Sequence, residues 1–248
     1  MTAPLINDAL AERLETVGLA RGSYTVKPHD RLRKLIAQRM TESARDIPHF
    51  PLTMEICLDA LLATRMSHNA SEGAVRVSIN DLIVRAAALA LTDVPEANVS
   101  YAPEGMVHHI GVDVAVAVAV KGGIMTPIVR AAATKTVSAI SAELRDLADR
   151  AQCFRLQPDE YSGGNITVSN LGMFGIASFG SILNPPQALI LSVGAARKRP
   201  LLRNGELAEE SFMAVTLTCD HRALDGATGA QWLQAFRVLL ETPDRIFA

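Results

Sequence analysis

Residues 112–120 read V-D-V-A-V-A-V-A-V, and this alternation constrains the fold more than any other stretch of the chain. Valines fill one face of the predicted strand and mostly alanines fill the other, so both faces are apolar. Such a strand is expected inside a sheet that is covered on both sides, with its alanine face close to a neighbouring layer. Lys121-Gly122-Gly123 then turns the chain into a second apolar run, residues 124–129, which predicts a hairpin.

Short periodic patterns predict the other elements. Capping residues followed by apolar positions at helical spacing predict helices between Asn7 and Gly18, from Asp30 past Met40, from Ser78 to Leu91, from Thr136 to Ala151 and from about Ala227 to Leu240. Pro48 and Pro51 end the second of these helices. Short β-type runs predict strands at residues 52–56, 166–169, 188–193 and 212–219. Because helices and strands mix without strict alternation, we expect an α/β or α+β fold around one mixed sheet.

Composition excludes several classes of protein. The net charge is −2, from 24 Lys and Arg against 26 Asp and Glu, which gives no basic surplus for a nucleic acid or an anionic membrane. The longest apolar run, residues 114–120, is too short to span a bilayer, and no secretory signal precedes it. The three cysteines are far apart and form no C-x-x-C pair, which argues against disulfides and a zinc site. We therefore expect a soluble protein of the cytoplasm, or of the mitochondrial matrix in a eukaryote.

Of the six histidines, only His221 stands in a setting typical of chemistry. It lies in T-C-D-H-R-A-L-D-G, residues 218–226, between a predicted strand and a predicted helix, where a rigid sheet can position a loop. Carboxylates, including that of Asp225, flank this titratable imidazole. The bare pattern by itself favours a structural loop in which Asp225 caps the last helix. The adjacent pair His108 and His109 is a poor metal site, because neighbouring strand residues point to opposite faces.

A second candidate constellation is G-G-N-I-T-V-S-N-L-G, residues 163–172. The hydroxyl of Ser169, at the end of a predicted strand, could donate to a developing oxyanion. Ser169 and Asn170 fit ordinary turn chemistry equally well, because both side chains bond readily to their own backbone. The chain has no Walker loop, no G-x-G-x-x-G and no G-x-S-x-G, so nucleotide-binding and serine-hydrolase interpretations have no support.

Together, these segments resemble the catalytic core of the dihydrolipoamide acyltransferases of 2-oxo acid dehydrogenase complexes. The family signature D-H-R-x-x-D-G stands at residues 220–226 and continues as A-T-G-A-Q-W-L, while T-V-S-N-L-G-M-F-G stands at 167–175. The other matching segments are R-K-L-I-A-Q-R-M at 33–40, I-P-H-F at 47–50, V-P-E-A-N at 94–98, G-I-M-T-P-I-V at 123–129 and N-P-P-Q at 184–187. The resemblance covers about residues 24–248, with its motifs in the family's order, and it reverses the structural interpretation of His221.

This resemblance implies a fold like that of chloramphenicol acetyltransferase, a mixed sheet flanked by helices and assembled as a homotrimer, with each active site at a subunit interface. His221 then corresponds to the catalytic general base, Asp225 to the aspartate of the same signature, and Ser169 to the hydroxyl near the oxyanion. Asn170, Arg33 and Lys34 are weaker candidates for substrate binding, and either of the last two could be the basic partner of Asp225.

The implied reaction moves an acyl group between the thiol of dihydrolipoamide and that of coenzyme A. His221 would remove the thiol proton, and Ser169 would stabilise the tetrahedral oxyanion. The T-V-S-N-L-G-M-F-G-I and T-L-T-C-D-H-R forms are most similar to pyruvate-type, acetyl-transferring members. Coenzyme A and lipoamide are substrates, and no bound cofactor or metal is expected on this chain.

The chain also departs from the family's full-length pattern. Residues 1–22 are predicted to be an N-terminal helical extension and residues 23–248 the acyltransferase core, with neither a lipoyl domain nor a peripheral-subunit-binding domain. A lipoyl group on another domain or chain would then be the substrate. Family trimers also assemble into cubic or icosahedral cores through apolar C-terminal tails, and Ile246 and Phe247 could either serve that contact or pack on their own subunit.

Two other functions compete with the acyltransferase. One is a catalytically silent core subunit that keeps the fold as a scaffold, although the intact His221, Asp225 and Ser169 argue against it. The other is an acetyltransferase for a free small molecule, like chloramphenicol acetyltransferase, which has a histidine where Asp220 stands here.

Overall fold

A computed structural model describes residues 8–203 and 205–248. The chain divides into two compact units, Met1–Gln38 and Arg39–Ala248. The first contains α1 (Asp8–Thr16) and the beginning of α2 (Arg31–Asp46), which ends in the second. Both helices were predicted. Gly18, just after α1, has the left-handed backbone (φ 87°) that glycine adopts readily at a helix end, whereas Asn7, the predicted cap, lies outside the described residues.

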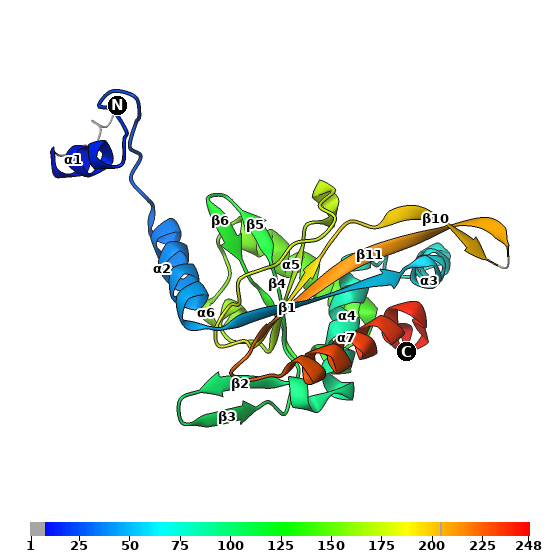
Figure 1. Ribbon diagram of the computed structural model, residues 1–248. Coiled ribbons are helices and arrows are strands. Elements are labelled where there is room, and N and C mark those ends of the chain that lie inside the picture. The colour runs from blue at the N-terminus through cyan, green and yellow to red at the C-terminus, as the bar shows by residue number, and fades with distance from the viewer. Residues whose placement is uncertain (1–7, 204) are drawn as a thin grey trace. The chain divides into compact units, whose positions relative to one another are not determined.

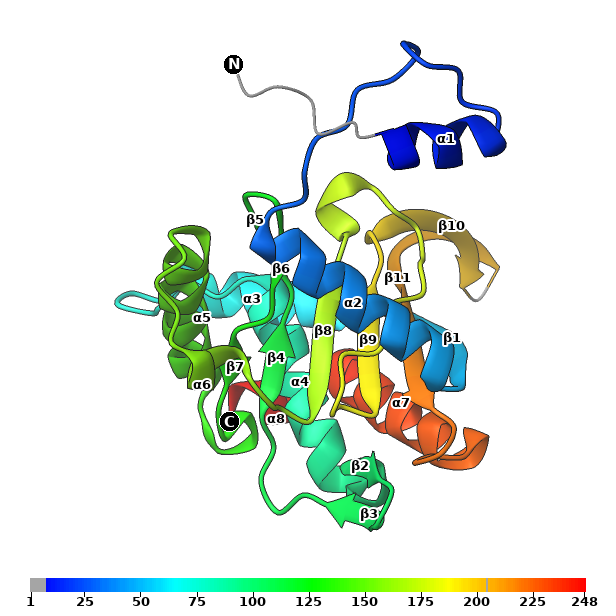
Figure 2. The ribbon, with the colours of Figure 1, turned by 90° about the vertical axis from the view of Figure 1, so that its left-hand side faces the viewer.

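The second unit is organised around one seven-stranded mixed sheet (Figures 1 and 2). Its strands lie in the order β1 (His49–Cys57), β11 (Glu206–Asp220), β9 (Leu189–Val193), β8 (Ile166–Asn170), β4 (Val114–Val116) and β7 (Ile128–Val129), with β10 (Arg197–Arg203) also paired to β11. The pairs β4–β8 and β8–β9 are parallel, and the other pairs are antiparallel. The mixed sheet confirms the predicted fold class.

The alternating segment that dominates the sequence does not form one continuous strand. Residues 114–116 are buried as β4 in the sheet, as predicted, but the chain then leaves the sheet and forms β5 (Val118–Val120). The predicted hairpin is present, because β5 pairs with β6 (Gly123–Met125) and β4 pairs with β7. β5 is only partly covered, so the prediction of a strand buried on both faces was wrong beyond residue 116. Alternation predicts extended backbone, but it does not show where the chain leaves a sheet.

Two more strands were predicted too short. β1 begins at His49 rather than at residue 52 and includes Pro51, which an edge strand tolerates because one side of its backbone is unpaired. β11 begins at Glu206 rather than 212, where its polar first half pairs with β10 as a two-stranded arm (Figure 1). A small sheet of β2 (Val99–Ala102) and β3 (Gly105–His108) lies outside the main one.

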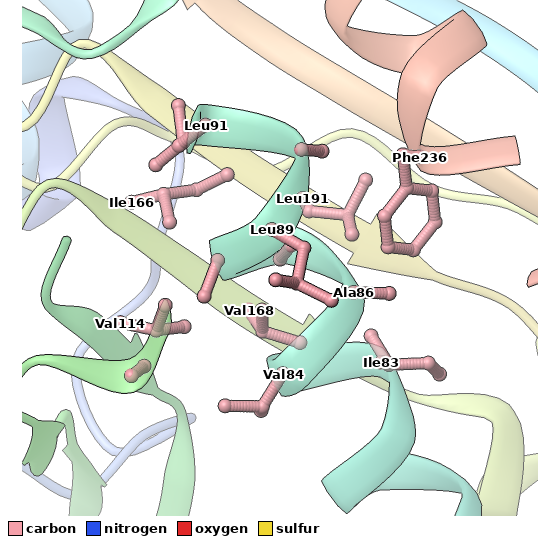
Figure 3. Packing of buried hydrophobic residues seen from close by; sticks show 14 of the residues in the cluster. Ile83, Val84, Ala86, Leu89, Leu91, Val114, Ile166, Val168, Leu191 and Phe236 are labelled. Carbon is pink, nitrogen blue, oxygen red and sulfur yellow. The ribbon is translucent and has the colours of Figure 1, made fainter. Parts of the chain in front are cut away.

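Helix α4 (Ile79–Asp93) forms the centre of the hydrophobic core, and every residue from 81 to 91 is buried. Its predicted capping box is present, since the Ser78 hydroxyl accepts from the Asp81 amide and the Asp81 carboxylate accepts from the Ser78 amide. Figure 3 shows side chains of this helix beside those of β4, β8, β9 and a further helix, α7 (Gly226–Glu241). These residues include Leu89, Leu91, Val114, Ile166, Val168, Leu191 and Phe236.

The remaining helices surround this centre. They are α3 (Asp59–Ala70), α5 (Val137–Gln152), α6 (Pro158–Tyr161) and α8 (Asp244–Phe247), with short 3₁₀ turns at Pro95–Ala97, Ala132–Thr134 and Gly172–Phe174. Thr136 caps α5 as predicted, and α7 buries the predicted apolar residues, among them Trp232 and Phe236. Ile246 is fully buried in its own core, and the Phe247 ring lies 5.2 Å from that of His68, so both residues pack on their own subunit. Within the described residues, no helix is long and apolar enough to cross a membrane.

Candidate active site

His221 lies in the tight connection between the end of β11 and the start of α7 (Figure 1). The carbonyl of Asp220 accepts hydrogen bonds from the amides of Ala223 and Leu224, each at 3.0 Å, which closes the turn. The chain then enters α7 at its N-cap, Asp225. The sequence predicted this strand–loop–helix junction, which exposes His221 at the edge of a rigid sheet.

Asp220 stabilises the loop that carries His221 through its contacts with Arg222. Its side chain is 4% exposed and forms a bidentate ion pair with Arg222, with contacts of 3.0 Å to Nε and 2.8 Å to the terminal nitrogen. The Arg222 guanidinium also lies over the ring of Tyr101, 4.2 Å from its centre. Both carboxylate oxygens of Asp220 therefore bind Arg222, and Asp220 does not pair with the imidazole of His221.

The imidazole of His221 is held by contacts that leave its nitrogens free. The His221 amide donates to the carbonyl of Pro48 at 3.0 Å, and the Phe50 ring packs against the imidazole with centres 4.4 Å apart. Within residues 8–203 and 205–248, no group hydrogen-bonds the ring nitrogens of His221. A positioned imidazole with both nitrogens available can accept and return a proton.

Asp225 acts as a helix cap in this structure. Its Oδ1 accepts from the amide of Thr228 at 2.8 Å. That hydrogen bond is the main cause of a lowered pKa for Asp225, and the charge of nearby His221 lowers it further. The side chain therefore stays ionised at neutral pH and holds the loop, as predicted. Its proposed basic partners, Arg33 and Lys34, belong to the Met1–Gln38 unit, so that pairing stays a prediction.

Cys219, next to this loop, is excluded as a nucleophile. Its side chain is fully buried, and burial raises the pKa of the thiol to about 12. The thiol and carboxylates of Cys57, Asp59 and Glu210 place their ligand atoms within 4.8 Å of one another, but none of the predicted site residues belongs to that cluster.

Ser169 and Asn170 end strand β8. Asn170 is engaged locally: its Oδ1 accepts from the Gly172 amide at 2.9 Å, and its Nδ2 donates to Asn80 on α4 at 3.3 Å. Ser169 is half-buried, and its hydroxyl has no hydrogen-bond partner among the described residues. Ser169 can therefore donate to a ligand, whereas Asn170 shapes the turn that follows.

The strand register places Ser169 and His221 at opposite ends of the sheet. Ser169 is level with Ser192 of β9, which is level with Thr216 of β11. His221 follows Thr216 by five residues, which is about 17 Å along an extended strand, and it lies two strands or about 10 Å to the side. The two groups therefore cannot act on one substrate within a single copy of the chain.

Sequence reasoning did not assign roles to Pro48, Phe50 or Tyr101, although each fixes the His221 loop. The signal for the first two was the I-P-H-F segment, which stood out only as part of a family pattern. Tyr101 had no signal, because its contact with Arg222 joins the small sheet to a loop far along the chain.

The fold and this histidine loop agree with a known family. The chain belongs to the 2-oxoacid dehydrogenases acyltransferase (catalytic domain) family, whose model matches residues 21–248. This finding confirms the resemblance seen in the sequence.

Individual curated proteins are similar to this chain over most of its length. The dihydrolipoyllysine-residue acetyltransferase component of the pyruvate dehydrogenase complex of Rhizobium meliloti is 48% identical over 228 residues, which cover 90% of this chain and 51% of that protein. The corresponding mitochondrial component 3 of Arabidopsis thaliana is 45% identical over 226 residues, covering 89% of this chain and 42% of the relative. The chain thus spans about half the length of the curated relatives it matches.

Solved structures show the same fold. A probable dihydrolipoamide acetyltransferase from Listeria monocytogenes matches with a TM-score of 0.83 and 30% identity, covering 90% of this chain and 96% of its own. The dihydrolipoamide acetyltransferase of Azotobacter vinelandii matches with a TM-score of 0.86 and 25% identity over the whole of both chains. Chloramphenicol acetyltransferase, at 16% identity, has a TM-score of 0.51 over 87% of this chain and 98% of its own, which confirms the predicted fold alone.

Proposed function

We propose that this chain is the catalytic core of a dihydrolipoamide acetyltransferase, which moves an acetyl group between dihydrolipoamide and coenzyme A. The observation that carries the proposal is the exposed imidazole of His221, which the Pro48 carbonyl and the Phe50 ring hold in place while no described residue hydrogen-bonds its ring nitrogens. Residues 23–248 form this core, and the lipoyl group arrives on another domain or another chain of a pyruvate dehydrogenase complex. We place the reaction in the cytoplasm, or in the matrix of a mitochondrion.

The spacing of the candidate residues supports their roles. Structural and enzymatic work on the Azotobacter vinelandii enzyme concerns a serine, a histidine and an asparagine in the catalytic mechanism, which follow one another at intervals of 52 and 4 residues. Ser169, His221 and Asp225 keep both intervals in this chain. Aspartate stands here in place of the asparagine, and both residue types cap a helix start well.

The reaction follows from the chemistry of thiols. A thiol is a poor nucleophile until it loses its proton, so His221 removes the proton as sulfur attacks the acetyl thioester. The carbonyl carbon forms a bond to the new sulfur, and the electrons of the C=O bond move onto oxygen. The Ser169 hydroxyl donates to this oxyanion. When the oxyanion collapses, the old C–S bond breaks, and the proton on His221 passes to the departing sulfur.

The separation of Ser169 and His221 supports a trimer whose active sites lie between subunits. In a ring, the His221 end of one copy can meet the Ser169 end of the next, and each contact then makes one complete site. A relative of known structure forms the cubic core of a pyruvate dehydrogenase multienzyme complex, and a trimer of this chain is the unit from which such a core can be built.

The direct test is acetyl transfer from acetyl-coenzyme A to free dihydrolipoamide by the wild-type chain and by His221→Ala. We expect turnover that falls by about 10²- to 10⁴-fold in the variant, the usual contribution of a general base. His68→Ala, which alters a histidine on α3, is the matched control and should keep wild-type turnover. Equal background rates for wild type and His221→Ala would overturn the proposal and favour a silent scaffold subunit.

A further inference from the structure

The segment of residues 47–50, at the entrance to β1, determines where His221 lies. The carbonyl of Pro48 accepts from the His221 amide at 3.0 Å, and the Phe50 ring packs on the imidazole. His49, between them, is directly opposite Asp220 in the register of β1 and β11. Any movement of this segment therefore moves the backbone anchor and the ring packing of His221 together.

His49 itself is fastened by both ring nitrogens. Its Nδ1 lies 2.7 Å from the carbonyl oxygen of Ile47, and its Nε2 lies 2.9 Å from the backbone nitrogen of Leu183. A carbonyl can only accept and an amide N–H can only donate, so Nδ1 must carry the proton and Nε2 must accept. The two contacts thus select one form of the ring, the neutral Nδ1–H tautomer.

The peptide that His49 binds is also held from its other side. The hydroxyl of Ser43, itself 2% exposed, donates to the carbonyl of Leu183 at 2.7 Å. The Leu183 side chain is fully buried and packs with Ile47 and Ile190 in a cluster separate from the main core. We call Ser43, Leu183 and His49 the clasp. It ties residues 47–50 to a loop that is 134 residues away along the chain.

We propose that His49 is a positioning residue for acetyl transfer, which holds residues 47–50 so that His221 meets the thiol in a productive geometry. This inference rests on the proposed function. His49 makes no contact with the imidazole of His221 among the described residues; it acts through Pro48 on one side and Phe50 on the other. A misplacement of about 1 Å at a reacting group can cost on the order of 100-fold in rate.

Two substitutions at His49 separate hydrogen bonding from bulk. His49→Leu fills similar space but loses both hydrogen bonds, whereas His49→Gln keeps an oxygen that can accept from the Leu183 amide. We expect kcat to fall about 10- to 100-fold in His49→Leu with KM for both substrates within about threefold, because binding is kept and geometry is lost. In His49→Gln we expect kcat within about threefold of wild type. His68→Leu is the matched control on α3 and should behave like wild type.

A measurement independent of activity tests the clasp itself. With ¹⁵N-labelled histidine, NMR of the intact assembly should show His49 as the neutral Nδ1–H tautomer, and this signal should be unchanged in His221→Ala. A charged His49 or an Nε2–H tautomer would overturn the proposal, as would unchanged kcat in His49→Leu or equal losses in the Leu and Gln variants. If wild type transfers no acetyl group while the tautomer is as expected, the proposed function is wrong, and so is the positioning role that rests on it. The hydrogen bonds of the clasp would still be confirmed in that case.

Discussion

The two ends of the central sheet are built in different ways. At the His221 end, an ion pair, a backbone hydrogen bond, an aromatic ring and a helix cap fix the loop within one chain. At the Ser169 end, the chain leaves β8 with Met173 and Phe174 at 78% and 70% exposure. The His221 loop is therefore fixed within a single chain, whereas the Ser169 end exposes apolar side chains that another copy can cover.

The largest effect is expected when two inactive variants are mixed. Trimers of His221→Ala alone and of Ser169→Ala alone should each lose most activity, whereas trimers assembled randomly from equal amounts of both should recover about a quarter of wild-type sites, because one interface in four combines an intact histidine with an intact serine. Activity of co-expressed, purified trimers checks this. Mixtures no better than the two parents would show that each site is built within one chain.

A large effect is also expected from the exposed loop after β8. Replacing Met173 and Phe174 together by Ser should weaken assembly by at least about 10-fold in dissociation constant, since burying one such side chain contributes about 1.5–3 kcal/mol. Sedimentation equilibrium measures this. Met66→Ser, which changes a similarly exposed residue on α3, is the control and should assemble like wild type.

A smaller effect, on the free energy of unfolding, is expected when the ion pair between Asp220 and Arg222 is removed. Asp220→Ala leaves the Arg222 guanidinium, 32% exposed, without its partner and should lower the free energy of unfolding by about 2 kcal/mol, less than for a fully buried pair because solvent screens Arg222. Asp93→Ala removes an exposed pair with Arg245 and should cost below about 1 kcal/mol. Urea unfolding of the two variants compares them, and equal losses would contradict the special role of Asp220.

The smallest effect concerns acid stability. The pKa of Asp225 is lowered in the folded chain, so its contribution to stability is complete above the ordinary pKa of an aspartate and is lost as pH falls through the folded value. Asp225→Asn keeps the cap and should unfold with less dependence on pH in that acidic range. Thermal unfolding between about pH 2 and 6 checks this prediction, which fails if the two pH profiles coincide.

Sequence patterns predicted the parts of this structure whose causes are local. Ser78, Thr136 and Asp225 cap the helices they were expected to cap, because a capping side chain bonds within its own turn. The arm of β10 and β11 was missed, since its strands are polar and stabilise each other by pairing. The contacts of residues 47–50 with the His221 loop were also missed, and the resemblance implied sites between subunits without showing how far Ser169 lies from His221. Both features depend on strand register between distant segments.

The proposed sharing of each site between two copies also has a consequence for mass action. On that proposal, an isolated chain holds one of each half-site and has no working site, whereas a closed ring has as many sites as chains. Specific activity should then rise with total protein concentration and level off once every ring is closed. Dilution becomes a means of switching the reaction off, without any change in the fold of the individual chain.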